Sequence, residues 1–256
     1  MLIDTHAHLD DERLVNDLPA VLERARDAGV VNVLTIGIDA STSRANVALA
    51  DAHPILFAAV GIQPNHVADA QASDWDALLD LAKQPKVIAI GETGLDRYWD
   101  RAPFPLQEEY FARHLQLARM LDKPVVIHCR EAEADVVRML RTEFENQGPI
   151  RGIMHSFAGN EATARECLAM GLHISFAGML TFKNSEPLRK VAATIPLDRL
   201  LVETDSPYLA PMPYRGKRNE PAFVAHTAAC LAQIFALPFE ALSEQTTGNA
   251  RRLLRI

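Results

Sequence analysis

The chain has 256 residues, of which 48% are apolar, 23% charged and 6% aromatic. This length and apolar content can bury a large core, and they exclude a disordered or fibrous protein. The 26 Lys and Arg residues against 33 Asp and Glu residues give a formal net charge of −7, which argues against a broad basic surface for nucleic acid. A polyanionic partner would therefore need a local cationic site.

Targeting and redox signals are sparse. The longest apolar runs, such as residues 55–62, are too short to span a bilayer, and the N-terminus lacks the basic and apolar segments of a secretory signal. The three cysteines, Cys129, Cys167 and Cys230, are an odd and scattered set, which is typical of reduced thiols. We therefore expect a cytoplasmic protein with no membrane partner and no obligate protein partner.

Short apolar runs alternate with stretches of helical periodicity along the whole chain. Strands are predicted at residues 2–8, 31–38, 55–62, 87–92, 125–128, 152–155, 174–176 and 200–203. Helices are predicted at residues 11–28, 42–52, 74–83, 105–121, 131–144, 161–170, 187–194 and 221–235, and a last short one ends near residue 254. Ser73 is expected to cap its helix, and Gly29 to end the first one. The strands are nearly continuous in apolar residues, as buried parallel strands are.

Eight strands that each lead into a helix predict an α/β protein with a (β/α)₈ TIM barrel, in one domain over residues 1–256. The alternative is an open doubly wound sheet. The first strand is not followed by the Gly-x-Gly-x-x-Gly turn of a dinucleotide-binding sheet, which favours the barrel.

Potential metal ligands follow five of the predicted strands at their C-terminal ends. They are His6, His8, Glu92, His128, His155 and Asp205. His6 and His8 are two residues apart, so both imidazoles project to one face of an extended strand. In a barrel these strand ends converge on one mouth, and four imidazoles with two carboxylates could hold two divalent ions if one carboxylate bridges them.

Each of these residues also has a simpler interpretation. Glu92 or Asp205 alone could cap a helix, and a lone His-x-His pair is often structural. Six such residues at one end of the predicted barrel favour a metal site. The other histidines are expected to be solvent-facing or structural, except His66, which follows the third strand on the side of the predicted site. The histidines expected to be solvent-facing or structural are His53, His114, His173 and His226.

With these residues in place, the sequence resembles the TatD family of metal-dependent deoxyribonucleases, within the amidohydrolase-type barrels, over essentially the whole chain. The motifs that carry the resemblance are IDTHAHL at 3–9, GETGLD at 91–96, VIHCR at 126–130, HSFAG at 155–159, LVETDSP at 201–207 and RGKRNEP at 215–221. The resemblance implies one metal held by His6, His8, Glu92 and Asp205. It implies that Glu92 bridges to a second metal on His128 and His155.

One motif departs from the family pattern. Many relatives carry Gly-x-His-Pro-His after the third strand, whereas this chain has Gln63 and Asn65 at the two histidine positions. Both amides can donate a hydrogen bond to a phosphate oxygen, but neither supplies a cation or an imidazole-type proton donor. We therefore expect metal binding to be retained and substrate handling to be altered.

The leading hypothesis is hydrolysis of a DNA phosphodiester by metal-activated water. Asp205 would orient or deprotonate the water, and Glu92 would set the distance between the metals. Residues expected to contact substrate are Arg130, Arg215, Lys217, Arg218, Gln63 and His66. The alternative for the basic loop 215–218 is a solvated turn. Loop aromatics on the same side could stack unpaired bases; they are Tyr98, Trp99, Phe157, Phe182 and Tyr214.

By resemblance, the expected activity is a 3′ to 5′ exonuclease on single-stranded DNA with two Mg²⁺ or Mn²⁺ ions, with Zn²⁺ as a further candidate. A second hypothesis uses the same metals in an amidohydrolase, lactonase or phosphotriesterase, or in a deacylase of D-aminoacyl-tRNA. A third is a metal-bound binding protein without hydrolytic activity. The basic loop favours a polyanionic substrate, and the complete ligand set favours an enzyme.

Overall fold

Eight parallel strands form one sheet whose spatial order follows the chain. The structure is a computed structural model that describes residues 1–256. The strands are β1 (Leu2–Ala7), β2 (Val30–Ile36), β3 (Leu56–Val60), β4 (Val87–Asp96), β5 (Val125–Arg130), β6 (Gly152–Met154), β7 (His173–Phe176) and β8 (Leu200–Val202). Each connection returns the chain to the same end of the sheet, as parallel pairing requires.

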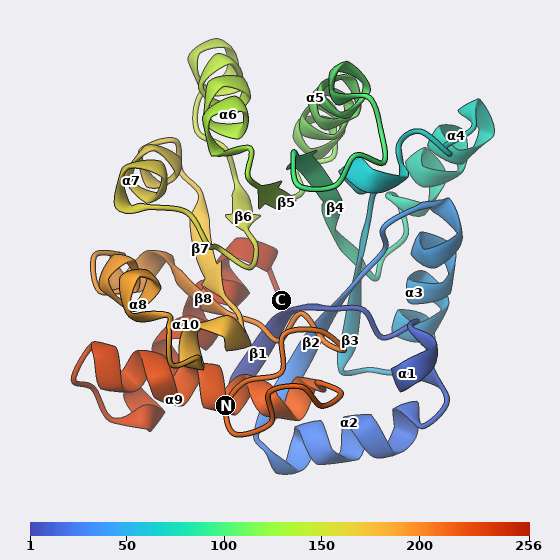
Figure 1. Ribbon diagram of the computed structural model, residues 1–256. Coiled ribbons are helices and arrows are strands. Elements are labelled where there is room, and N and C mark those ends of the chain that lie inside the picture. The colour runs from blue at the N-terminus through green and yellow to red at the C-terminus, as the bar shows by residue number, and fades with distance from the viewer.

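The sheet closes on itself between β1 and the segment that follows β8. The amide of Asp205 donates to the carbonyl of His6 at 2.8 Å, and the amide of His8 donates to that of Ser206 at 2.7 Å. The Thr5 hydroxyl donates to the Val202 carbonyl at 3.0 Å. These bonds join the two edges, and the predicted (β/α)₈ barrel is confirmed. Figure 1 shows the helices arranged around the strands.

The helices are α1 (Glu12–Val15), α2 (Leu18–Asp27), α3 (Ala40–Ala52), α4 (Ala72–Leu81), α5 (Phe104–Met120), α6 (Glu133–Gln147), α7 (Glu161–Ala169), α8 (Glu186–Ala192), α9 (Val224–Ile234) and α10 (Phe239–Leu254). Short 3₁₀ turns are η1 (Pro64–His66), η2 (Gly178–Thr181), η3 (Leu197–Arg199) and η4 (Pro221–Phe223). Gly29 ends α2 with a φ of 83°, as predicted.

Most predicted boundaries shift by a few residues, the last helix has 16 residues where a short one was predicted, and three differences have a clear local cause. The expected helix over 11–28 is broken between α1 and α2, because Pro19 cannot continue a helix from residue 15 but fits the first turn of a new one. Ser73 is not the cap of α4: Gln71 takes that position, and its amide donates to the Asp74 side chain at 2.9 Å. Strand β4 runs beyond Glu92 to Asp96, since this extension pairs with β5.

Two buried clusters stabilise the barrel. Inward-facing residues such as Ile3, Leu34 and Val126 form an inner cluster, which Leu253 and Leu254 of α10 complete from the N-terminal end of the strands. A larger cluster lies between the outer surface of the sheet and the surrounding helices. The strands are thus covered on both faces, which explains their continuous apolar sequence.

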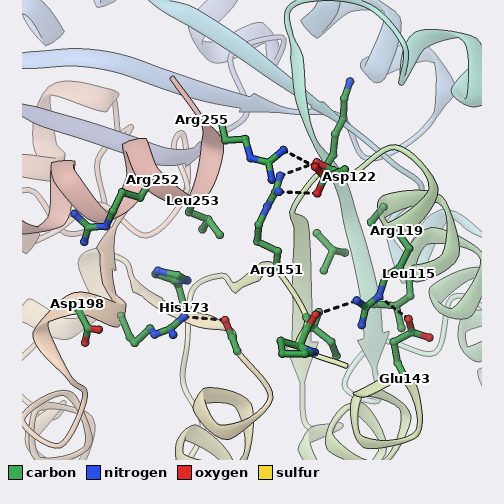
Figure 2. Close-up of a pocket in the computed structure, with 17 residues that line it drawn as sticks. Leu115, Arg119, Asp122, Glu143, Arg151, His173, Asp198, Arg252, Leu253 and Arg255 are labelled. Carbon is green, nitrogen blue, oxygen red and sulfur yellow. Dashed lines mark hydrogen bonds and ion pairs between the residues drawn. The ribbon is translucent and has the colours of Figure 1, made fainter. Parts of the chain in front are cut away.

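Two further features concern the surface. No single helix is long and apolar enough to cross a membrane; the segment Pro221–Ile234 and α10 approach that composition only as a pair bent by 110°. At the N-terminal end of the barrel, a cavity opens beside α10 (Figure 2).

Candidate metal centre

The six predicted ligands come together at the C-terminal end of the barrel, around the carboxylate of Glu92. Its Oε2 lies 3.4 Å from Nε2 of His6 and 3.8 Å from Nε2 of His8. Its Oε1 lies 3.0 Å from Nδ1 of His128 and 3.3 Å from Nε2 of His155. Each oxygen of one buried carboxylate therefore faces a different pair of imidazoles, which is the arrangement of a bridging ligand.

Asp205 lies beside the first pair of imidazoles, those of His6 and His8. Its Oδ1 lies 3.4 Å from Nε2 of His8 and 3.7 Å from Nε2 of His6. The residue has a φ of 56°, in the left-handed region that Asp enters more readily than most residues. Ser156, two residues beyond β6, and Glu131, directly beyond β5, also have positive φ. Non-glycine residues in this region gather where the surrounding structure enforces them, as it does around functional sites.

Two glycines bring Glu92 close to β5. Gly91 has a φ of 140°, and a Cβ there would lie 2.5 Å from the carbonyl oxygen of Val126. Gly94 has a φ of 136°, and its Cβ would lie 2.0 Å from the carbonyl oxygen of His128. Since no side chain fits at either position, β4 can approach β5 on both sides of Glu92.

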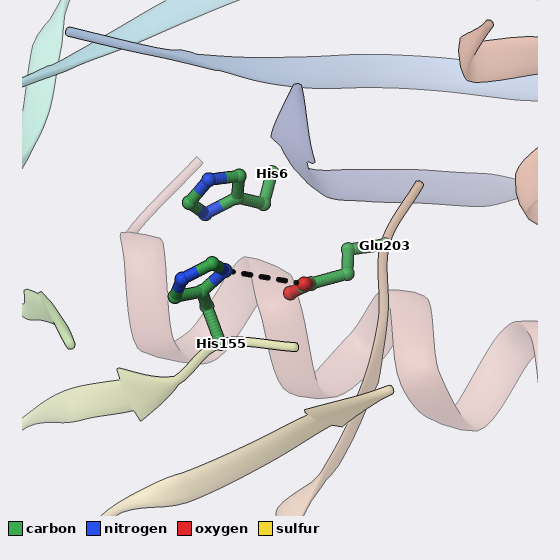
Figure 3. A group of neighbouring side chains, drawn as sticks. All are labelled: His6, His155 and Glu203. Carbon is green, nitrogen blue, oxygen red and sulfur yellow. Dashed lines mark ion pairs between the residues drawn. The ribbon is translucent and has the colours of Figure 1, made fainter. Parts of the chain in front are cut away.

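Three buried carboxylates that the sequence analysis did not single out support the ligands. Asp96 Oδ2 lies 3.0 Å from Nε2 of His128, and Asn65 donates to the same oxygen at 2.9 Å. Glu203 Oε1 lies 3.4 Å from Nδ1 of His155 (Figure 3). Asp4 accepts hydrogen bonds from the amide and hydroxyl of Thr204 at 2.9 and 2.6 Å.

These carboxylates lie within the motifs that carry the predicted ligands, two to four residues from a ligand, so the motifs themselves contain these residues. A carboxylate behind a ligating imidazole fixes the ring orientation and raises its basicity. Asp96 stands in this relation to His128, and Glu203 to His155.

The charges at the site are strongly coupled. Burial alone would raise the pKa of Glu92, but the imidazoles of His155, His128 and His6 outweigh it and hold that pKa well below its usual value. Burial alone would lower the pKa of His8, but the carboxylates of Asp205 and Glu92 raise it to about 9. Burial raises the pKa of Asp4 to about 8.

The donor set fits divalent metal ions. Nε2 of His6 lies 3.3 Å from Nε2 of His8, so two lone pairs can face each other only with a proton or a cation between them. The rings of His6 and His155 stack with centroids 3.9 Å apart (Figure 3). The residues form three groups, and within each group the ligand atoms lie within 4.8 Å of one another. The groups are His6, His8 and Asp205; Glu92, His128 and His155; and His6, His155 and Glu203. Mixed nitrogen and oxygen donors of this kind suit several divalent ions.

The residues expected to contact substrate are placed less uniformly. Arg130 is exposed at the end of β5, with its guanidinium 3.8 Å from the centre of the Tyr98 ring. Arg215 lies 4.5 Å from the centre of the Phe182 ring, and Lys217 lies 6.0 Å from that of Tyr214. These three cations are therefore exposed and free of carboxylate partners.

The other predicted contacts are engaged within the protein. Arg218 pairs with Asp17 at 2.8 Å and with Glu220 at 3.5 Å, so its charge is largely neutralised. Gln63 accepts a hydrogen bond from the amide of Asn65 at 3.0 Å. His66 lies in η1, where its Nδ1 is 4.0 Å from Asp39.

Comparison with known proteins identifies the family of this chain. Residues 3–255 match the family described as TatD related DNase. The chain belongs to the TatD family. Over 256 residues it is 41% identical to a Bacillus subtilis protein of this family named "Uncharacterized metal-dependent hydrolase YabD", with 100% of each chain covered. The fold, the donor set and the family together make this protein a metal-dependent hydrolase.

Two other members of the TatD family extend the comparison. The chain is 34% identical over 261 residues to the "3'-5' ssDNA/RNA exonuclease TatD" of Pantoea vagans, with 100% of each chain covered. The solved structure of YJJV, a TatD homologue from Escherichia coli, superposes with a TM-score of 0.93 at 28% identity. That match covers 100% of this chain and 98% of the other, so the barrel extends over the same length in both.

Proposed function

We propose that this TatD-family hydrolase removes nucleotides from the 3′ end of single-stranded DNA with two divalent ions, Mg²⁺ or Mn²⁺. The observation that carries the proposal is the position of Glu92, whose two oxygens face the His6 and His8 pair and the His128 and His155 pair. The exonuclease name of the Pantoea vagans relative supports the same class of substrate.

The chain's own residues would divide the chemistry between them. His6, His8 and Asp205 would hold one ion, His128 and His155 the other, and Glu92 both. Ions held there would make water more acidic and stabilise negative charge on the phosphate. Asp205 would orient the water and accept its proton, and the greater exposure of its side chain, 15% against 4% for Glu92, supports this role.

A group of aromatic and cationic side chains beside the centre suits a nucleic acid end. The amides of Tyr98 and Trp99 each donate to Asp96 Oδ1 at 2.9 Å, and Asp96 contacts His128. Both rings are exposed, by 48% and 42%, and Arg130 lies against them. An unpaired base can stack on such rings while the guanidinium neutralises a phosphate.

The deciding experiment is a product-resolved assay on 5′-labelled single-stranded and double-stranded DNA, with Mg²⁺, with Mn²⁺ and after chelation. We expect a ladder that shortens from the 3′ end, on single strands, only with metal. Arg130→Ala should weaken cleavage, whereas Arg165→Ala, on the exposed surface of α7, should not.

Absence of any shortened product from metal-loaded protein would contradict the nuclease proposal. The same preparation would then be tested with lactone, phosphotriester and D-aminoacyl-tRNA substrates, which the alternative hypotheses require. Turnover of one of these at an unaltered metal centre would reassign the substrate without changing the ligands.

A further inference from the structure

A second concave site lies at the end of the barrel opposite the metal centre. It is a cavity of about 730 Å³ beside the starts of β5 and β7, with Leu253 of α10 in its wall. Figure 2 shows polar side chains from several elements around it. Sites for small molecules commonly have volumes of roughly 300–1,000 Å³. The cavity is therefore large enough for a ligand.

The cavity wall is cationic, although the protein as a whole is acidic. Six cations line it: Arg119, Lys123, Arg151, Arg199, Arg252 and Arg255. Three carboxylates accompany them: Asp122, Glu143 and Asp198. The local formal charge is thus positive in a chain with a net charge of −7. Such a concentration of one sign attracts anions.

Part of this charge has a structural use. Arg119 pairs with Glu143 at 2.9 Å, and Arg151 pairs with Asp122 at 2.8 Å. Arg255 also contacts Asp122. Cations in the last turn of a helix, as Arg119 is in α5, complement the helix dipole. These arginines do not by themselves indicate a ligand.

Arg199 and Arg252 differ from the other three arginines because neither forms an ion pair, and Lys123 donates to the carbonyls of Ala82 and Val87. Arg199 donates to the carbonyl of Gly171 at 3.1 Å, and Arg252 donates to the side-chain oxygen of Asn249. Each guanidinium has five N–H donors, so most of them have no protein partner. Two unpaired arginines in one cavity wall leave a concentrated set of donors.

Two residues of the cavity wall, His173 and Arg151, each have a buried polar atom without a partner. His173 is 9% exposed, and its Nδ1 has no hydrogen-bond partner. Burial, with Arg199 nearby, lowers the pKa of His173 to about 4, so the ring is neutral and offers one N–H. The Nε of Arg151 is also buried without a partner. Buried polar groups are normally hydrogen-bonded, so these two atoms lack the partner that such groups usually have.

We propose that this cavity binds a small molecule with two or more phosphate groups, of the size of a nucleoside triphosphate. Arg199 and Arg252 would hold phosphate oxygens through their N–H forks, and the ring of His173 would donate a further hydrogen bond. Apolar residues such as Val125, Ile150 and Leu253 would contact the uncharged part of the ligand. The site is separate from the proposed nuclease centre and does not depend on it.

The test is isothermal titration of the full chain, dialysed against chelator, with ATP and with pyrophosphate. Chelation prevents a metal at the other end of the barrel from holding the phosphates. We expect saturable binding of both probes, weakened at least tenfold in Arg199→Gln combined with Arg252→Gln. Arg165→Gln on α7 is the matched control and should bind as the wild type does.

Thermal melts establish that each variant is folded. Arg199→Gln alone, which gives up only the bond to Gly171, serves if the double variant does not fold. Three results would overturn the proposal: no saturable binding of either probe, unchanged affinity in the arginine variants, or displacement of both probes by a single-stranded oligonucleotide. The last result would make this end of the barrel a nucleic-acid surface instead.

Discussion

Asp96 Oδ2 lies 3.0 Å from Nε2 of His128, the ring nitrogen opposite the one that faces Glu92. Burial alone would raise the pKa of Asp96, but hydrogen bonds from His128, Trp99 and Asn65 lower it to about 2. The group is therefore an anion at neutral pH, and it holds His128 with Nδ1 toward Glu92.

Removing this charge should weaken the centre without removing a ligand. Asp96→Asn is expected to lower metal affinity or hydrolytic activity by about 10-fold to 100-fold, the usual effect of losing a carboxylate behind a ligating imidazole. Titration of metal-free protein with Mn²⁺ measures the affinity. Asp135→Asn, which alters an exposed ion pair with Arg97, is the control. Equal affinities of the two variants for Mn²⁺ would show that Asp96 does not position His128 for metal binding.

Glu92→Gln should change metal stoichiometry as well as rate. The amide keeps the shape of the side chain but supplies only one oxygen, so it cannot serve both imidazole pairs. We expect about one bound ion per chain in place of two, and a loss of activity of more than about 100-fold. Elemental analysis of the purified variant beside the wild type checks the first expectation. Two tightly bound ions in Glu92→Gln would show that the bridge is not needed.

Metal removal should lower the thermal stability of the folded protein. Nε2 of His6, Nε2 of His8 and Oε2 of Glu92 lie 3.3 to 3.8 Å from one another, so an ion held among them would join side chains of β1 and β4. Ions that bind only the folded chain add about 2.7 kcal/mol each at a free concentration of 100 times the dissociation constant. Thermal melts with chelator and with added Mn²⁺ measure the difference. Identical melting temperatures under the two conditions would count against a metal centre here.

The exposed loop cations should control the salt dependence of nuclease activity. Arg215→Ala combined with Lys217→Ala removes two charges without disturbing an ion pair. Because each neutralised phosphate on a single strand contributes about 0.7 to the slope of log affinity against log salt, we expect that slope to become shallower by up to about 1.4. Arg165→Ala with Lys83→Ala is a control on other surfaces. An unchanged slope would assign the loop to a solvated turn.

His114 makes the stability depend on pH. Burial lowers its pKa to about 4; Nε2 accepts from the amide of Ile62 at 3.0 Å, and Nδ1 bonds the carbonyl of Tyr110 at 2.6 Å. The unfolded chain has the higher histidine pKa, about 6.5, so it binds the proton first as pH falls and folding stability decreases between about pH 6.5 and 4. This group should cost about 2 kcal/mol between pH 7.5 and 5. Urea unfolding at both pH values should show a smaller difference in His114→Gln than in the wild type.

The sequence predicted the barrel because each strand is covered on both faces and so appears as a continuous apolar run. The sequence also predicted that the six ligand residues lie close together, since the C-terminal ends of parallel strands meet at one mouth. Asp96 lies in the same motif as Glu92, but its contact with His128 depends on β4 continuing past Glu92 to pair with β5, which the predicted strand 87–92 did not include. The partner of Arg218 was equally hidden, because Asp17 is 201 residues away in sequence. The cavity opposite the metal centre depends on where α10 packs, which no local pattern encodes.

The bonds that close the barrel belong to the same residues that carry the chemistry. The backbone of Asp205 is joined to that of His6, and the amide of Thr204 is held by Asp4. Closure of the sheet therefore also places Asp205 beside His6 and His8. A nascent chain on the ribosome cannot complete this group of ligands until β8 and the segment after it have emerged, so hydrolytic competence is expected only when synthesis of the barrel is nearly complete.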